Sequence, residues 1–333
     1  MRAPFRKALL AWYEAVFRDL PWRQTSDFYR VWISEIMLQQ TRVEAVIPYY
    51  LRFLERFPTV ECLAAAPEQD VLAAWSGLGY YSRARNLHRA AQQVAEGGVP
   101  STHPEIAALA GIGPYTSAAI ASIVLGLPHA AVDGNVIRVV SRLTNDASEI
   151  SSPAARRRFG EIAQGLLDAA RPGDFNQAMM ELGATVCKPG APLCGQCPVV
   201  TFCAARGAGT ERELPVKLKK AKTRDVLLQL MIFRRADEVY LVQRDAGESR
   251  LAGFWELPDK SLFPRLQGRL AAEFTHQIVN DRFRVSVWSS RGSPELPEGR
   301  WTAVADLGGI PLATISRKAL KAVPDMAIFG STR

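Results

Sequence analysis

The chain has 333 residues, of which 48% are hydrophobic, and a formal net charge of +8. This length allows two or three domains with their own cores, and no apolar run approaches the roughly 18 residues that a membrane span needs. The N-terminal segment predicts an amphipathic helix over residues 5–20 rather than a signal peptide, so we expect a cytoplasmic protein. The basic charge favours a polyanionic partner.

One carboxylate of the next predicted helical segment has apolar neighbours in the sequence. Residues 27–57 predict helices that are interrupted near Gln39–Thr41 and again at Pro48, and Glu35 lies among Val, Trp, Ile, Met and Leu. Burying an unpaired charge is costly, so Glu35 is either on the solvent face of an amphipathic helix or a buried functional acid. In an apolar pocket its pKa would rise to about 6, which suits a general acid near neutral pH.

Two short segments carry side chains that suit nucleic acid. The amides of QQT can hydrogen-bond to base edges, and the tyrosine ring and guanidinium groups of GLGYYSRARNLH can stack on bases and pair with phosphates. The alternatives are a polar helix end and a core tyrosine beside a solvated basic face. The candidate contacts are Gln39, Gln40, Thr41, Tyr80, Arg83 and Arg85.

A helix, a tight turn and a second helix are predicted around LAGIGPYTSAAI. Gly111, Gly113 and Pro114 cannot continue a helix, so the turn separates helices over residues 104–110 and 115–125. Backbone amides of such a turn, close to a helix N-terminus, form a site for an anion such as phosphate. The alternative is an ordinary turn between two helices.

A second carboxylate, Asp133, follows this stretch at the start of a further helix, VDGNVIRVV. Asp is a common N-cap residue, which is the ordinary explanation for its position. The functional interpretation is an acid close to the phosphate-binding turn.

Up to about residue 186 no segment shows sustained strand alternation, so the first part of the chain is predicted to be all-α. Four of the five cysteines then fall within 17 residues, spaced C-x6-C-x2-C-x5-C. In a cytosolic chain this clustering favours metal over disulfides. Zinc and a [4Fe–4S] cluster both accept four thiolates, and the six-residue gap fits paired zinc knuckles poorly. The expected ligands are Cys187, Cys194, Cys197 and Cys203, whereas Cys62 is expected in the core.

The composition changes over residues 207–222, where Gly, Pro and four Lys predict a basic linker. After it, DVLLQLMIF, EVYLVQR and RFRVSVW have the short apolar or alternating patterns of strands. The sequence therefore predicts a second, α+β domain over residues 223–333.

Taken together, these motifs resemble the MutY family of adenine DNA glycosylases in the helix-hairpin-helix superfamily, over nearly the whole chain. The segments that carry the resemblance are VWISEIMLQQT, GLGYYSRARNLH, LAGIGPYTSAAI, AVDGNVIRV, NQAMMELGATVC, the four-cysteine loop, GFWELP and FTH. The resemblance implies a domain over residues 1–206, with a six-helix barrel at about 23–132 and an iron–sulfur module at about 133–206 that includes the N-terminal helix. It places the active site between these parts and implies a Nudix-like C-terminal domain that reads 8-oxoguanine.

The resemblance also implies an activity: hydrolysis of the N-glycosidic bond of adenine mispaired with 8-oxoguanine or guanine, after the base has been flipped out of the duplex. Glu35 matches the acid that protonates adenine N7 and then activates water, and Asp133 matches the carboxylate that stays ionised and stabilises the oxocarbenium-like sugar. Tyr115 and Asn135 match residues that support this pair. Gln39, Gln40, Thr41 and Tyr80 match residues that fill or wedge the opened duplex.

The residue after the hairpin separates this chain from the endonuclease III branch, where a lysine at that position forms a Schiff base and cleaves the strand. Tyr115 cannot do so, which predicts a monofunctional enzyme. Its expected partner is duplex DNA with A opposite 8-oxoguanine or guanine. We expect a monomer associated with the nucleoid, with an abasic-site endonuclease acting next on the product.

The C-terminal domain departs from the family pattern. Phe274, Thr275 and His276 resemble the loop that recognises 8-oxoguanine, with Thr in place of the usual Ser. Only residues 259–269 separate GFWELP from the next strand-like stretch, where a Nudix-like fold usually has a longer loop and a helix, so a trimmed domain is expected. A Nudix hydrolase is disfavoured because the glutamate cluster that holds Mg²⁺ is missing from this region.

Two alternatives remain. One is a relative that acts on another mismatch, such as thymine opposite guanine, which Glu35 argues against. The other is a non-catalytic Fe–S protein that binds DNA or transfers electrons and leaves Glu35 and Asp133 idle.

Overall fold

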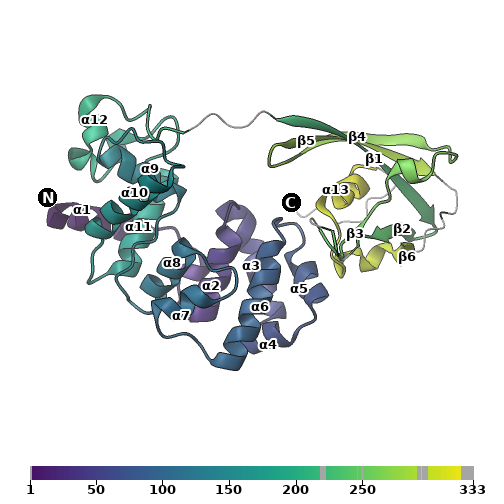
Figure 1. Ribbon diagram of the computed structural model, residues 1–333, viewed down its shortest axis with the longest axis horizontal. Coiled ribbons are helices and arrows are strands. Elements are labelled where there is room, and N and C mark those ends of the chain that lie inside the picture. The colour runs from purple at the N-terminus through teal and green to yellow at the C-terminus, as the bar shows by residue number, and fades with distance from the viewer. Residues whose placement is uncertain are drawn as a thin grey trace. The chain divides into compact units, whose positions relative to one another are not determined.

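The computed structural model describes residues 2–217, 223–245, 247–248, 251–290, 294 and 299–323. The chain forms two compact units, one of residues 1–64 with 89–219 and the other of residues 65–88 with 220–333. The first is helical, and the second contains the sheet, so the predicted combination of an all-α part and a C-terminal α+β part is confirmed (Figure 1). Of the predicted linker, residues 218–222 lie outside the described residues. Among the helices described, none has the length and apolar character of a membrane span.

The first unit is built from helices, most of them between 5 and 15 residues long. In chain order they are α1 (Arg2–Val16), α2 (Phe28–Leu38), α3 (Val43–Arg56), α4 (Val60–Ala65), α7 (His103–Ala108), α8 (Pro114–Val124), α9 (Gly134–Leu143), α10 (Pro153–Leu166), α11 (Pro172–Thr185) and α12 (Ala204–Ala208). Helix α6 (Ser82–Gly97) is divided between the two units. Short 3₁₀ helices cover Pro21–Arg23, Cys194–Gln196 and Val200–Phe202.

One hydrophobic cluster of this unit joins α1 to α9, α10 and α11. Phe5 and Leu9 of α1 are buried with Val139, Phe159 and Phe175. The predicted N-terminal helix is therefore real, although it runs from Arg2 to Val16 rather than over residues 5–20.

The predicted break at Pro48 is wrong, because α3 continues through it from Val43 to Arg56. A proline inside a helix removes one hydrogen bond and costs about 3 kcal/mol. The apolar face of α3 offsets this cost, since Val46, Tyr50 and Phe53 are all buried. The other predicted break, at residues 39–42, is confirmed as the connection between α2 and α3.

Cys62 is exposed, so the prediction that it lies in the core is wrong. It belongs to the short helix α4, in which Val60 and Leu63 are the buried residues. Because side chains three apart share one helix face, Cys62 points away from the face that these two residues bury.

The second unit contains helix α5 (Glu68–Trp75) and a mixed sheet. Its strands are β1 (Arg224–Arg235), β2 (Glu238–Gln243), β3 (Trp255–Glu256), β4 (Arg269–Ile278), β5 (Asp281–Ser290) and β6 (Gly299–Ala303). The order is β3-β2-β1-β5-β4, with β6 also paired to β2, and β1 runs parallel to β5. Helix α13 (Thr314–Ala322) packs on the sheet (Figure 1).

The alternation of β1 explains how the sheet is covered on both faces. Leu230 and Ile232 enter the cluster that includes α13, whereas Met231 and Phe233 enter a separate cluster with Phe263. The short connection between β3 and β4 holds one 3₁₀ turn, Lys260–Leu262, and no α-helix in its described residues.

Candidate active site

Glu35 is buried inside the first unit, with 6% of its surface exposed. Helix α2 is buried on nearly every side, so its single carboxylate is enclosed by apolar neighbours and does not lie on a solvent face, which was the other interpretation of the sequence. Its side chain accepts a hydrogen bond of 2.8 Å from the hydroxyl of Tyr115, on α8. Helices α2 and α8 lie side by side in Figure 1. Tyr115, the residue that follows the hairpin in the sequence, therefore contacts Glu35 directly.

Burial raises the pKa of Glu35 to about 7. The hydrogen bond from Tyr115 opposes this rise, the negative charge of Asp133 adds to it, and the Arg23 guanidinium again opposes it. A carboxyl group with a pKa near neutrality can hold a proton and give it away at physiological pH. Asp133 thus lies near enough for its charge to act on Glu35, and a joint role of the two carboxylates stays a prediction.

Asp133 caps helix α9. One carboxylate oxygen accepts the backbone N–H groups of Asn135 and Val136 at 2.9 and 2.8 Å, and the other accepts the Asn135 side-chain amide at 2.7 Å. Burial raises the pKa of Asp133 above its ordinary 3.8, while these hydrogen bonds oppose the rise. Asp133 is therefore the N-cap of α9, and its charge acts on Glu35. The three hydrogen-bond donors around Asp133 favour its ionised form.

Arg138 is a site residue that the sequence did not reveal. Its guanidinium donates to the side-chain oxygen of Asn135 at 2.8 Å and to the backbone oxygen of Cys187 at 2.8 Å. A Cβ at Gly183 would lie 2.6 Å from that of Asn135, so glycine is what lets α11 approach α9 here. The only signal in the sequence is an arginine one turn after Asp133 within an apolar helix.

A second buried network was also missed. Glu181 is 1% exposed and accepts hydrogen bonds from Arg18 at 2.7 Å and Arg23 at 2.6 Å. Next to it on α11, the Met180 sulfur lies 3.1 Å from the Tyr115 hydroxyl. These contacts join residues more than 60 positions apart, and local patterns do not predict them.

The predicted hairpin is present between α7 and α8, with its two glycines in different roles. Gly111 has a φ of 75°, which favours glycine, whereas Gly113 has a φ of −95° and is the N-cap of α8. A Cβ on Gly113 would meet nothing within 4 Å. Nothing inside the described structure therefore requires glycine at this position.

The polar residues after α2 lie close to this hairpin. The Gln39 side chain donates a hydrogen bond of 3.1 Å to the Thr116 hydroxyl of α8. The Thr41 hydroxyl bonds to the backbone of Gln39 at 3.3 Å. Gln40 between them has a φ of 58°, an uncommon conformation for a residue with a side chain.

Tyr80 belongs to the second unit, in the turn between α5 and α6. It has a φ of 49° and is 47% exposed. Arg83 donates to the backbone oxygen of Gly79 at 3.1 Å, and Arg85 pairs with Glu68 at 3.0 Å. Both predicted phosphate contacts thus have partners within the protein, and their contact with DNA stays a prediction.

The three residues predicted to form an 8-oxoguanine loop lie in the middle of strand β4. Their partners on β5 are Arg284 for Thr275 and the neighbouring Val285 and Phe283. Thr275 is exposed, its backbone oxygen accepts Lys318 at 2.8 Å, and the Lys318 ammonium lies 4.8 Å from the Phe274 ring. Burial lowers the pKa of His276. A regular ladder with β5, rather than a loop, holds this tripeptide.

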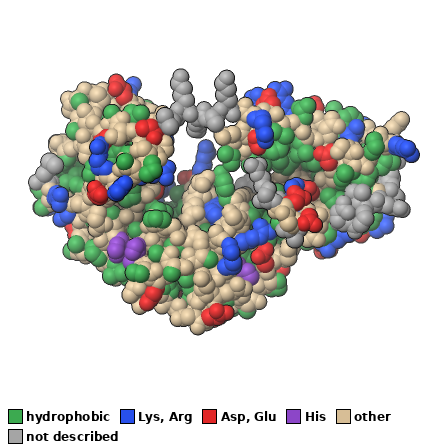
Figure 2. All heavy atoms as spheres, in the orientation of Figure 1, with side chains coloured by type: hydrophobic (Ala, Val, Ile, Leu, Met, Phe, Trp, Pro, Cys, Tyr) green, Lys and Arg blue, Asp and Glu red, His purple; other side chains and the backbone are tan. Residues whose placement is uncertain are grey.

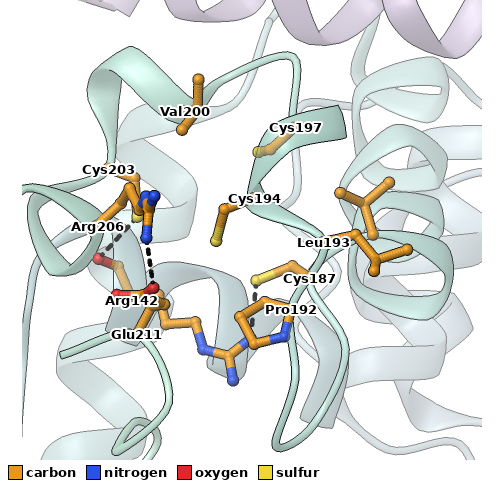
Figure 3. Close-up of a pocket in the computed structure, with 11 residues that line it drawn as sticks. Arg142, Cys187, Pro192, Leu193, Cys194, Cys197, Val200, Cys203, Arg206 and Glu211 are labelled. Carbon is orange, nitrogen blue, oxygen red and sulfur yellow. Dashed lines mark hydrogen bonds and ion pairs between the residues drawn. The ribbon is translucent and has the colours of Figure 1, made fainter. Parts of the chain in front are cut away.

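The four clustered cysteines line one pocket (Figure 3). Arg142 borders it, 1% exposed, with one terminal nitrogen 3.2 Å from the Cys187 sulfur and the other buried without a hydrogen-bond partner. No group of three or more His, Cys, Asp or Glu side chains suited to holding a metal ion occurs among the residues described.

The excess of basic residues is not gathered into one field on the face drawn in Figure 2. Lys and Arg side chains there alternate with Asp and Glu side chains. On this face, charge alone therefore does not identify a surface for nucleic acid.

The sequence of this chain matches those of known proteins. Residues 33–164 match the family described as HhH-GPD superfamily base excision DNA repair protein. An adenine DNA glycosylase of Homo sapiens is 46% identical over 222 residues, which are 63% of this chain and 41% of that protein. One of Schizosaccharomyces pombe is 34% identical, with the match covering 86% of this chain and 77% of that one. The chain spans less than half the length of the Homo sapiens and Rattus norvegicus relatives.

Solved structures share the helical fold. A thermostable thymine-DNA glycosylase is 28% identical, with a TM-score of 0.55 and a match covering 62% of this chain and 97% of that one. An endonuclease III in a non-covalent DNA complex has a TM-score of 0.52 at 21% identity, covering 62% and 95%, which bears on the fold alone. Given this fold and the extended match to the Schizosaccharomyces pombe protein, the chain belongs to the family of adenine DNA glycosylases.

Proposed function

We propose that this protein is a monofunctional glycosylase that removes adenine mispaired with 8-oxoguanine or guanine from duplex DNA, in base excision repair. The observation that carries the proposal is a buried Glu35 whose carboxyl has a pKa of about 7, together with a half-buried Asp133 whose carboxylate is held by three donors and whose charge acts on Glu35. Breaking an N-glycosidic bond requires a protonated leaving base and a stabilised sugar cation, and this pair supplies both.

The two carboxylates and Tyr115 divide the steps of the reaction among them. The Glu35 carboxyl gives its proton to N7 of the flipped adenine, so that the bond to the sugar breaks with a neutral base leaving. The Asp133 carboxylate stabilises the positive charge that develops on the sugar. The ionised Glu35 then accepts a proton from the attacking water. The Tyr115 hydroxyl fixes the acid in place through its 2.8 Å hydrogen bond.

The residues around the pair favour this chemistry over two neighbouring activities. A phenol at position 115 cannot form the Schiff base that strand cleavage needs. Thymine has no N7, so a protonated carboxyl at Glu35 has no equivalent acceptor in a thymine–guanine mismatch. The likeness to a thymine-DNA glycosylase concerns the fold and leaves that activity as the second candidate.

The test is adenine release under single-turnover conditions from duplexes with A opposite 8-oxoguanine, G or T, with strand cleavage by alkali as a separate step. We expect release from the first two duplexes, fastest with 8-oxoguanine, and intact strands before alkali. Release of thymine from T opposite G, without release of adenine, would favour the second candidate. Binding without release of any base would leave the non-catalytic alternative.

The rate of release is expected to fall on both sides of an optimum. As pH rises through about 7, Glu35 loses the proton that it must donate, so the rate declines. As pH falls, Asp133 takes up a proton and loses its charge, with a midpoint above its ordinary 3.8. Rate constants measured across this range check the prediction. The account is wrong if the rate keeps rising from pH 7 to pH 9.

We further propose that the four cysteines hold a [4Fe–4S] cluster. They line one pocket and supply the full set of thiolates, and the buried, unpaired nitrogen of Arg142 beside them lacks an acceptor that cluster sulfur would provide. Such a cluster would supply covalent cross-links between α11 and the loop that leads to α12. Arg138 and Arg142 tie the same loop to α9, and so connect its fold to Asp133.

Replacing Cys197 with Ala is expected to abolish visible absorbance and bound iron, which should be about four atoms per wild-type chain. The variant should also unfold at a temperature lower by 5 °C or more, because cluster binding contributes folding free energy (an estimate on the order of several kcal/mol). Cys62→Ala is the matched control, since that thiol is exposed and distant in sequence. Zinc in place of iron in the wild type would contradict this assignment.

The remaining contacts belong to the same proposal. Gly111 and Gly113 offer backbone amides to a phosphate, and the open space at the Gly113 Cβ position suits a close approach of DNA. Gln39, Gln40, Thr41 and Tyr80 would fill or wedge the opened duplex, and Arg83 and Arg85 would contact its phosphates. A Nudix-like C-terminal domain would read 8-oxoguanine through Phe274, Thr275 and His276.

We place the enzyme in the cytoplasm at the nucleoid, as a monomer whose product passes to an abasic-site endonuclease.

A further inference from the structure

Within the second unit, the turn that carries Tyr80 contacts residues that precede strand β3 and residues of helix α13. Residues 65–88 and the sheet form one compact unit although more than 130 residues separate them. At the centre of this contact, the Tyr81 and Phe254 rings lie 4.2 Å apart at an angle of 56°. Tyr81 is 6% exposed and Phe254 is fully buried. The two residues lie in the motifs GLGYYSR and GFWELP, and neither has a part in the proposed chemistry.

Polar contacts surround the two rings. The Tyr81 hydroxyl shares a hydrogen bond of 3.3 Å with Thr314, and it accepts the backbone N–H of Gly77 at 3.3 Å. Arg317 donates to the Ser76 hydroxyl at 2.8 Å. Arg85 donates to the backbone oxygen of Ala252 at 2.6 Å. Residues of the C-terminal part therefore hold the turn at both of its ends. The packing of the two rings is thus part of a larger set of contacts and is not an isolated apolar contact.

Within the turn, Tyr80 has little freedom except at its ring. Its backbone is left-handed, and Gly79 before it accepts hydrogen bonds from Trp75 and Arg83 at 3.2 and 3.1 Å. The Arg83 guanidinium lies 5.6 Å from the Tyr80 ring centre. The backbone that carries the exposed ring is therefore held by the same turn that Tyr81 anchors to Phe254.

We propose that Tyr81 and Phe254 are positioning residues that couple the lesion-reading sheet to the Tyr80 wedge, and so set the preference for A opposite 8-oxoguanine over A opposite guanine. The inference rests on the proposed function. A displacement of the sheet when 8-oxoguanine is bound reaches Tyr80 through this packed pair, because close-packed rings transmit rather than absorb small shifts. The coupling requires no contact between either residue and DNA.

The test is a double-mutant cycle on full-length protein with Tyr81→Ala, Phe254→Ala and the pair, read as single-turnover adenine release opposite 8-oxoguanine and opposite guanine. Each single variant should lower the ratio of the two rates about fivefold or more and leave the rate opposite guanine within about twofold. The pair should lower it no further than either single variant, since one coupling is removed. Tyr81→Phe keeps the ring and should keep most of the preference.

Leu262→Ala is the matched control, because that side chain is apolar and exposed in the same domain. Equal losses on both duplexes would show a merely structural contact and would overturn the inference, as would an unchanged ratio in both single variants. A wild-type protein that releases adenine equally fast from both duplexes would also overturn the inference, whereas one that releases no adenine would overturn the proposed function. If Phe254→Ala does not fold, hydrogen exchange of residues 77–81 in Tyr81→Ala decides: the inference predicts that 8-oxoguanine DNA no longer protects this turn more than guanine DNA does.

Discussion

Replacing Glu35 with Gln is expected to leave affinity for a mispaired duplex unchanged within a few-fold and to lower single-turnover adenine release by about a thousandfold. Gln has nearly the same shape and can accept the Tyr115 hydrogen bond, so the buried site keeps its packing. It has no proton to give to adenine N7. Affinity measured by titration and release measured in single turnovers separate the two effects. Glu55→Gln, at an exposed position of α3, is the control.

The same variant makes a prediction about stability. Burial raises the Glu35 pKa from 4.5 to about 7, so the stability that the protonated carboxyl contributes is complete below about pH 4.5 and is lost as pH rises through about 7. Gln does not ionise. Above pH 8 the variant should therefore exceed the wild type in free energy of unfolding by about 1–3 kcal/mol. A variant that is both less active and less stable than the wild type at pH 8 would contradict a buried Glu35 whose ionised form is unfavourable.

Replacing Asp133 with Asn is expected to lower adenine release by about a hundredfold or more while α9 keeps its cap. Asn is as good an N-cap as Asp, so the variant removes the charge and preserves the backbone. A second effect follows from the coupling of the two carboxylates. Without the charge that raises the Glu35 pKa, the fall in rate at high pH should move to lower pH.

Asp27→Asn is the matched control for this variant. Asp27 caps α2 and accepts a hydrogen bond of 2.8 Å from the Arg30 N–H. It is exposed and lies at the N-terminal end of α2, whereas Glu35 lies near the C-terminal end of that helix. It should change neither the rate nor its pH dependence. Equal effects of the two substitutions would mean that Asp133 serves only as a cap.

The sequence predicted those features that local chemistry determines. The hairpin follows from Gly111 and Pro114, and the burial of Glu35 follows from the apolar residues around it in α2. The strands β1, β2 and β5 follow from short apolar or alternating runs. The predictions for Pro48 and Cys62 were wrong because they considered the residue type alone. The buried face of the surrounding helix determines that α3 continues through Pro48 and that Cys62 is exposed.

Long-range contacts were beyond the sequence. Arg83 and Arg85 look like phosphate contacts in a basic segment, yet their partners are a backbone oxygen of the turn and Glu68 of α5. Arg138 joins Asn135 to the cysteine loop across about 50 residues. The placement of residues 65–88 with the C-terminal sheet likewise has no local signal, because it depends on which surfaces meet after folding.

The most direct test of the central claim replaces one atom of the substrate. In 7-deazaadenine a carbon takes the place of N7, the atom that Glu35 is proposed to protonate, and the rest of the base is kept. Opposite 8-oxoguanine this base should bind as tightly as adenine and be released at least about a hundredfold more slowly. Release at the rate of adenine would contradict acid catalysis at N7 and, with it, the part assigned to Glu35.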